Sequence, residues 1–136
     1  MTGPRIIHPP GWAPARGYAN GMLMPDGTLH IGGQIGWTAE QIFERTDFLG
    51  QMEQALQNIA EIVRTAGGEV SDIGRLTWFV TDKREYLARQ AEIGEVYRRV
   101  FGRHFPAMSM LVVADLIEDA ALLEIEATAF IPPARD

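Results

Sequence analysis

The chain of 136 residues contains no cysteine, and this absence excludes disulfide bonds and thiolate metal ligands. No stretch of it approaches the ~18 consecutive apolar residues that a membrane-spanning helix needs. The opening residues, Met1–Arg5, lack the apolar run of a secretory signal peptide. We therefore expect a cytoplasmic protein without a membrane partner.

Basic residues are also in the minority: 12 Lys and Arg stand against 18 Asp and Glu, for a net charge of −6. A chain with this balance repels polyanions on average. Arg98, Arg99 and Arg103 form a small basic cluster near the end of a predicted helix, where cations complement the helix dipole. No aromatic residues are interleaved with them to stack on bases. We expect no nucleic-acid partner.

Motifs for metals and common cofactors are missing as well. His8, His30 and His104 are scattered without the spacing of metal ligands, so we expect no metal. The glycine-rich run 32–36 lacks the spacing of dinucleotide and phosphate loops, and we interpret it as backbone that passes close to a neighbour. No Gly-x-Ser-x-Gly elbow indicates a serine hydrolase. The sequence predicts no cofactor.

The length favours one domain over residues 1–136, with residues 1–16, rich in Pro and Gly, as an irregular N-terminal arm. Residues 18–24 and 28–33 read as the strands of a hairpin. The turn between them, Pro25-Asp26-Gly27, suits a tight reversal because Gly accepts positive φ without steric cost.

Two amphipathic helices follow. Apolar residues at helical spacing predict a helix over 47–66, capped by Thr46 or Asp47 and ended by Gly67. Asp82 is placed to cap a second helix that runs to about residue 101. The apolar residues that we expect the second helix to bury are Leu87, Ile93, Val96, Tyr97 and Val100.

Strands are expected at 75–81, 108–114 and 121–130, which gives the order ββαβαββ. Two helices covering one face of a mixed β-sheet make a two-layer α/β (α+β) sandwich. Alternation in the last strand puts Leu123 and Ile125 under the helices and Glu124 and Glu126 on the open face, together with Phe79 or Trp78. Periodicity alone allows this face to be either a subunit interface or a solvated surface.

Four motifs, in this order and with compatible spacing, carry a resemblance to a known family. They are Gly17-Tyr18, Gly33-Gln34-Ile35, Gln54-Ala55-Leu56-Gln57-Asn58-Ile59, and Pro106-Ala107-x-Ser109 with Leu123-Glu124-Ile125-Glu126-Ala127. The chain resembles the RidA/YjgF family, of which many members hydrolyse reactive enamines and imines. The resemblance implies a chorismate-mutase-like homotrimer with a cleft for a small molecule at each subunit junction.

The resemblance also assigns residues. It implies that Glu124 positions the attacking water and is a catalytic residue together with Tyr18, and that Gly33 and Tyr86 belong to the substrate-binding cleft. The family's carboxylate-binding arginine is replaced by Met108. Arginine offers a planar, charged fork that pairs with a carboxylate through two bonds, and Met has no such group. The nearest cation in sequence is Arg16, which is either a replacement anchor or a flexible surface side chain.

Met108 and Met110 point to the same side of their strand. With Trp37 and Tyr86 they predict a more apolar pocket, or else they are ordinary core or interface residues; Ser109 of the signature is counted with the substrate-binding residues. Two functions stay open. The first is a RidA-like hydrolase (deaminase) acting on a small imine without a simple α-carboxylate. The second is a non-catalytic, small-molecule-binding or regulatory trimer.

Overall fold

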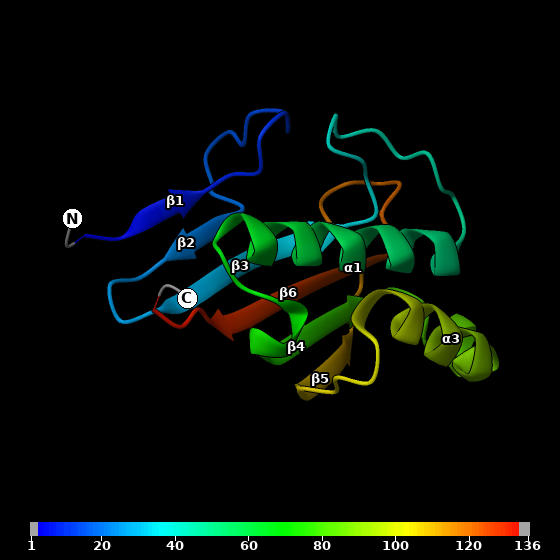
Figure 1. Ribbon diagram of the computed structural model, residues 1–136. Coiled ribbons are helices and arrows are strands. Elements are labelled where there is room, and N and C mark those ends of the chain that lie inside the picture. Colours follow the sequence, from blue (N-terminus) through cyan, green and yellow to red (C-terminus); the bar gives the residue numbers. More distant parts are fainter. Residues whose placement is uncertain (1–2, 134–136) are drawn as a thin grey trace.

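The computed structural model describes residues 3–133 as a β-sheet with helices on one face (Figure 1). Within these residues the sheet has six strands in the order β1-β2-β3-β6-β4-β5. The strands are β1 Arg5–Ile7, β2 Gly21–Leu23, β3 Thr28–Ile35, β4 Ile73–Val80, β5 Ala107–Val112 and β6 Leu123–Phe130. The helices are α1 Phe48–Thr65, α2 Lys83–Ala88 and α3 Gln90–Phe101, with a short 3-10 turn, η1, at Val70–Asp72.

The sheet is mixed, as predicted. Strand β6 lies between β3 and β4 and is antiparallel to both, while β4 and β5 are parallel. A parallel pair needs a long crossover connection, and here α2 and α3 supply it. Helices α1 and α3 lie side by side on the same face (Figure 1). The predicted two-layer α+β architecture is therefore confirmed.

The N-terminal arm differs from the prediction in one place. Residues 5–7 form β1, which pairs antiparallel with β2, so this part of the arm is not irregular. Residues 8–16 contain no helix or strand, and residues 1–2 of the predicted arm lie outside the described part of the chain. Single-sequence periodicity cannot identify a three-residue strand that depends on pairing with a distant segment.

The predicted second helix is two helices. It breaks at Arg89, whose φ of −122° and ψ of 24° are not helical. Leu87 is 52% exposed, so the prediction that it is buried was wrong. The apolar stripe of α3 contains Ile93, Val96 and Tyr97, and the residue two turns before Ile93 is Tyr86 rather than Leu87.

Alternation along the central strands is as predicted. Leu76, Trp78, Leu123 and Ile125 are all at most 2% exposed and pack under the helices. Glu124 pairs across the sheet with Phe79, so Phe79 rather than Trp78 shares the open face with it. The buried face is the core of the domain, and the open face carries the acidic residues of β6.

Candidate functional site

Helix α1 fixes the start of β6 through one buried side chain. Gln51, only 1% exposed, donates from Nε2 to the carbonyl oxygen of Ala120 at 2.9 Å. Its Oε1 accepts from the backbone N–H of Leu122 at 2.8 Å. Both bonds pair backbone groups of the segment that leads into β6 with a buried side chain. The side chain of Gln51 thus holds the segment that leads into β6, which begins at Leu123, one residue before Glu124.

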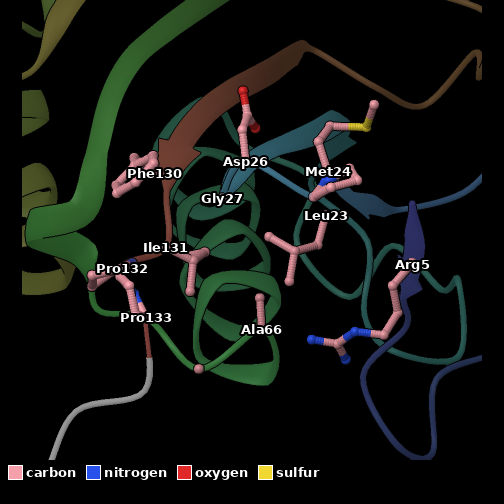
Figure 2. Close-up of a pocket in the computed structure, with 12 residues that line it drawn as sticks. Arg5, Leu23, Met24, Asp26, Gly27, Ala66, Phe130, Ile131, Pro132 and Pro133 are labelled. Atoms are coloured by element: carbon pink, nitrogen blue, oxygen red, sulfur yellow. The ribbon is translucent and has the colours of Figure 1, made fainter. Parts of the chain in front are cut away.

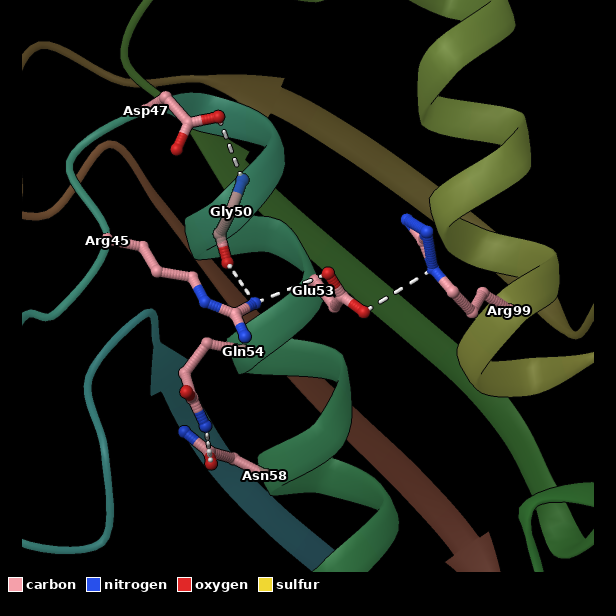
Figure 3. A network of polar contacts seen from close by, with 7 residues as sticks. All are labelled: Arg45, Asp47, Gly50, Glu53, Gln54, Asn58 and Arg99. Carbon is pink, nitrogen blue, oxygen red and sulfur yellow. Dashed lines mark hydrogen bonds and ion pairs between the residues drawn. The ribbon is translucent and has the colours of Figure 1, made fainter.

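The end of β3 is held from the same helix. Asn58 donates from Nδ2 to the carbonyl oxygens of Trp37 at 2.9 Å and Ile35 at 3.3 Å, and Gln54 donates to Asn58 Oδ1 at 3.0 Å. Figure 3 shows this pair on α1, beside the ion pairs of Glu53 with Arg45 and Arg99. The Arg99 pair ties α1 to α3. Strands β3 and β6 are therefore aligned by polar side chains of α1.

A β-bulge lies where β3 passes Glu126. Ile31 pairs with Ala127 and Gln34 pairs with Ile125, so Gly32 and Gly33 together face one residue of β6. Buried Gln34 stabilises the bulge, because its Nε2 donates to Asn20 Oδ1 and to the carbonyl oxygen of Gly32, both at 3.1 Å. The bulge turns the backbone of Gly33 toward the side chain of Glu124.

The glycines of this run allow two close approaches. A Cβ at Gly33 would lie 2.6 Å from Cδ of Glu124, closer than any real contact of this kind. A Cβ at Gly36 would lie 2.6 Å from Cα of Gln51, on α1. The prediction that this backbone passes close to a neighbour is confirmed, with the Glu124 carboxyl on one side and α1 on the other.

Glu124 sits in an environment that favours its neutral form. The side chain is half-buried, and burial is the main cause that raises the pKa of its carboxyl; the charge of Glu126 raises this pKa further. Carboxyls with a raised pKa in a cleft are candidates for proton transfer. The open face therefore presents one carboxyl that is suited to act as a general base.

Two other predicted residues lie toward the N-terminal arm. Tyr18 is 51% exposed, and its hydroxyl oxygen accepts from Gln41 Nε2 at 3.4 Å rather than bonding to Glu124. It lines a hollow of about 400 Å³ together with Trp12 and other arm residues. Arg16 is exposed and forms no ion pair within residues 3–133.

The methionines lie on the other side of the sheet. Met108 pairs with Leu76 and Met110 with Trp78, so both point to the face that the helices cover. They line a hollow of about 230 Å³. Its lining is Trp78, Tyr86, Gln90, Ile93, Gly94, Tyr97, Phe105, Met108 and Met110. The structure thus brings together Met108, Met110 and Tyr86, three of the four residues of the predicted apolar pocket.

Two residues of the predicted pocket are elsewhere. Trp37 is not part of this lining and packs against Phe43, with ring centroids 5.8 Å apart. Ser109 alternates with Met108 and Met110, so it faces the open side, where its Oγ accepts from Arg75 Nη2 at 3.1 Å. The reason in both cases is local geometry: Trp37 lies in the loop after β3, and successive strand residues point to opposite faces.

Met108 and Glu124 consequently lie on opposite faces of one sheet. A small molecule cannot contact both side chains within a single chain. Trp78, Gly94 and Phe105 also line the hollow but were not among the predicted site residues. Their position there depends on the parallel pairing of β4 with β5 and on the placement of α3, which periodicity does not predict. The helical stripe of Ile93 and Tyr97 was the available signal, and it indicated burial only.

Outside these two groups of residues, a further hollow with a volume of about 560 Å³ lies near the hairpin turn (Figure 2). Arg5, Asp26 and Phe130 are among its lining, and none of the predicted site residues is. Across residues 3–133 no group of three or more His, Asp or Glu side chains is placed to hold a metal ion. In the same residues no helix is long and apolar enough to cross a membrane.

Comparison with known proteins now decides the family. Residues 10–131 match the sequence model of the family described as Endoribonuclease L-PSP. The chain belongs to this family, the RidA/YjgF family. A 2-iminobutanoate/2-iminopropanoate deaminase of Salmonella typhimurium is 34% identical over 111 residues, which cover 79% of this chain and 78% of that protein.

Solved structures agree with this assignment. The crystal structure of Escherichia coli TdcF with bound serine is 33% identical and has a TM-score of 0.78, with 94% of this chain and 99% of that one covered. RidA from the Antarctic bacterium Psychrobacter is 29% identical with a TM-score of 0.78, and the match covers 93% and 99% of the two chains. The RidA-like fold spans nearly the whole chain.

Proposed function

We propose that this RidA-family protein is an enamine/imine hydrolase that works as a cytoplasmic homotrimer. Its site is the junction where Glu124 of one copy meets the Met108 hollow of another. One observation carries the proposal: the two groups of predicted site residues lie on opposite faces of the sheet. They can meet around one substrate only when two copies are in contact. The deaminase relative supports the choice of reaction.

Features of the surface support assembly. Strand β5 is an edge strand of the sheet, and its apolar residues Leu111 and Val112 are 47% and 55% exposed. Exposed apolar edge strands pair or aggregate unless something covers them. Leu111 pairs with Phe79, next to Glu124, so the apolar surface continues onto the open face. A second copy that covers this region would further bury Glu124.

The chemistry needs only a positioned water and a route for protons. Ionised Glu124 accepts a proton from water while the water oxygen bonds to the carbon of the C=N group. The carboxyl then returns this proton to the nitrogen, which gives a carbinolamine. The carbinolamine hydroxyl proton moves to the nitrogen as the C–N bond breaks and the C=O bond forms, so a carbonyl compound and ammonia leave. The balance is one imine and one water to one carbonyl compound and one ammonia. A base with a raised pKa is well matched to both proton transfers.

The hollow also restricts the substrate. No charged side chain is among its lining residues, so an α-carboxylate beside Met108 would be desolvated without a partner. We propose an imine whose C=N carbon carries no carboxylate. The family description names a ribonuclease, but a chain of net charge −6 repels RNA on average. The imine reaction is the better match to this charge.

The test is ammonia release from imines made in place. A flavin amino-acid oxidase supplies 2-imino acids, and a flavin amine oxidase supplies imines without a carboxylate. We expect the protein to accelerate ammonia release from the second group and the Glu124→Gln variant to lose that acceleration. Acceleration of 2-imino acids alone would contradict the proposed substrate class.

Met108 gives specific support to the alternative, a non-catalytic ligand-binding trimer, because the family's charged anchor is missing. If the protein accelerates ammonia release from no imine, and an intact trimer binds a small apolar ligand, the non-catalytic function is favoured. If the unaltered protein hydrolyses no imine and Glu124→Gln weakens the trimer, Glu124 is an interface hydrogen-bond acceptor. That result would also favour the non-catalytic function.

A further inference from the structure

The Met108 hollow, which is the hollow lined by Met108 and Met110, has a neighbour along β5. A second hollow of about 380 Å³ lies beside it and is lined by Val80, Lys83, Tyr86, Leu87, Met110 and Val112. The two hollows share Tyr86 and Met110. We call the two adjacent hollows together the β5 groove. It follows the helix-covered side of β5 from Met108 to Val112, which at about 3.3 Å per residue is roughly 13 Å of strand.

Charge along the β5 groove is confined to one end. The hollow around Met108 has no charged lining residue, and Lys83 is the only one in the second hollow. Lys83 begins α2 and forms no ion pair within residues 3–133. The nearby acids are engaged elsewhere: Asp82 accepts from the backbone N–H groups of Arg84 and Glu85, and Glu85 pairs with Arg89 at 2.6 Å.

A second polar group of the groove lacks a partner. Trp78 is 2% exposed and lines the Met108 hollow, and its Nε1–H has no hydrogen-bond acceptor among the described residues. Buried N–H groups are nearly always bonded, so an exception calls for an explanation such as a ligand. Its neighbours Met108 and Met110 have flexible side chains that can move aside for one. Both this N–H and the Lys83 ammonium are donors, and they call for acceptors on the ligand.

Resting on the proposed function, we infer that the substrate is an imine with an apolar chain and an anionic group at the end remote from the C=N carbon. The apolar chain lies on Met110 and Tyr86, and the anion pairs with Lys83. The imine of an ω-amino acid has this form. In a 2-imino acid the carboxylate is next to the C=N carbon, where the family's arginine would hold it. In the proposed substrate the carboxylate is at the far end of the chain.

Three imines with the same six-carbon chain test this inference. Oxidation of 6-aminohexanoate gives an imine with a remote carboxylate, hexylamine gives one with none, and norleucine gives a 2-imino acid. We expect a KM for the first that is about two- to fivefold lower than for the second, the range of an exposed ion pair. Equal KM values for the first two would overturn the inference while leaving the hydrolase function intact.

Variants assign the effect to Lys83. Lys83→Met removes the charge but keeps most of the apolar stem, and should raise KM for the remote-carboxylate imine only, with kcat unchanged, because the pair binds substrate and transition state alike. Lys83→Arg should retain the preference. Arg84→Met is the matched control, since Arg84 is the next residue of α2 and is not in the groove lining. A preference that survives in Lys83→Met would contradict the assignment.

Binding gives a readout that does not depend on turnover. Hexanoate and 1-hexanol are titrated into the assembled protein while the indole ¹H–¹⁵N NMR signals are followed. We expect hexanoate to bind more tightly than hexanol, to shift the Trp78 signal, and to lose its advantage in Lys83→Met. If hexanoate binds in this way but the protein hydrolyses no imine, the proposed reaction is wrong and recognition of the anion by Lys83 still holds. Equal binding of the two compounds would overturn the inference.

Discussion

The carboxyl of Glu124 occupies the space where a side chain at residue 33 would begin. A Cβ built on Gly33 lies 2.6 Å from Cδ of Glu124, at the bulge where β3 passes β6. Gly33→Ala should therefore displace the carboxyl, lower kcat for imine hydrolysis by at least tenfold, and destabilise the fold by roughly 1–3 kcal/mol through overpacking.

Gly74→Ala is the matched control for Gly33→Ala. Gly74 also lies in the sheet, but the nearest atom to its added Cβ is the Thr128 carbonyl oxygen at 4.0 Å. Urea unfolding and steady-state rates for both variants check the prediction. If Gly33→Ala keeps the activity of the Gly74 control, the position of Glu124 does not matter to the reaction.

The raised pKa of Glu124 predicts how activity depends on pH. A general base must be ionised, so kcat should rise with pH through this pKa. Because the charge of Glu126 contributes to raising the pKa, Glu126→Gln should shift the acidic limb of the pH profile to lower pH. A shift to higher pH, or none, would mean that another group controls the profile.

The same pKa predicts an effect on stability. The pKa of Glu124 is higher in the fold than the ordinary value of 4.5, so the folded state binds its proton more tightly than the unfolded state does. Its contribution to stability is then greatest below pH 4.5 and is lost as the pH rises through the raised pKa. Glu124→Gln should be more stable than the unaltered protein at neutral pH, and the difference should shrink toward pH 4.5 in thermal unfolding.

The side chain of Gln51 should contribute more to the free energy of unfolding than a surface glutamine does. Gln51→Leu removes the hydrogen bonds to the carbonyl of Ala120 and the N–H of Leu122, so we expect a loss of about 1–3 kcal/mol. Gln57→Leu is the control, because Gln57 is an exposed residue of the same helix. Denaturant unfolding measures both. A loss of less than 0.5 kcal/mol, the usual size of a surface effect, would show that β6 is not held by this side chain.

Met108→Arg restores the charged fork that the family uses. It should create or increase hydrolysis of 2-imino acids, because the fork pairs with the α-carboxylate through charge-assisted hydrogen bonds worth roughly 1.5–3 kcal/mol, or about ten- to a hundredfold in kcat/KM. Met108→Lys tests whether charge alone suffices. No gain in a folded trimer would mean that the pocket has diverged beyond the single residue.

Much of the fold followed from the sequence, because strand alternation and helical spacing are local. The face occupied by Glu124, the cap at Asp82 and the close approach at Gly33 are examples that the structure confirms. Leu87, the break at Arg89 and the strand at 5–7 were missed, since each depends on packing or pairing with distant residues. The lining of the Met108 hollow by Trp78 and Phe105 depends on how β5 and α3 are placed.

The site was less predictable than the fold for a related reason. Family motifs named Glu124 and Met108 individually, and periodicity placed each on a strand. Their separation onto opposite faces became visible only from the register that pairs Met108 with Leu76 and Glu124 with Phe79. The sequence does not distinguish Lys83 from other residues, because an exposed lysine at the start of a helix is common. The groove beside it is formed largely by other elements, whose placement periodicity does not predict.

The most direct test of the central claim is complementation between two inactive variants. Glu124→Gln lacks the base, and Met108→Glu places a carboxylate in the groove. Each alone should be inactive on the preferred imine. After unfolding and refolding as a 1:1 mixture, about a quarter of the activity of the unaltered protein should return, because each junction of the proposed symmetric trimer draws its two halves at random. An inactive mixture, with mixed trimers demonstrated by native mass spectrometry, would show that the site does not span two copies.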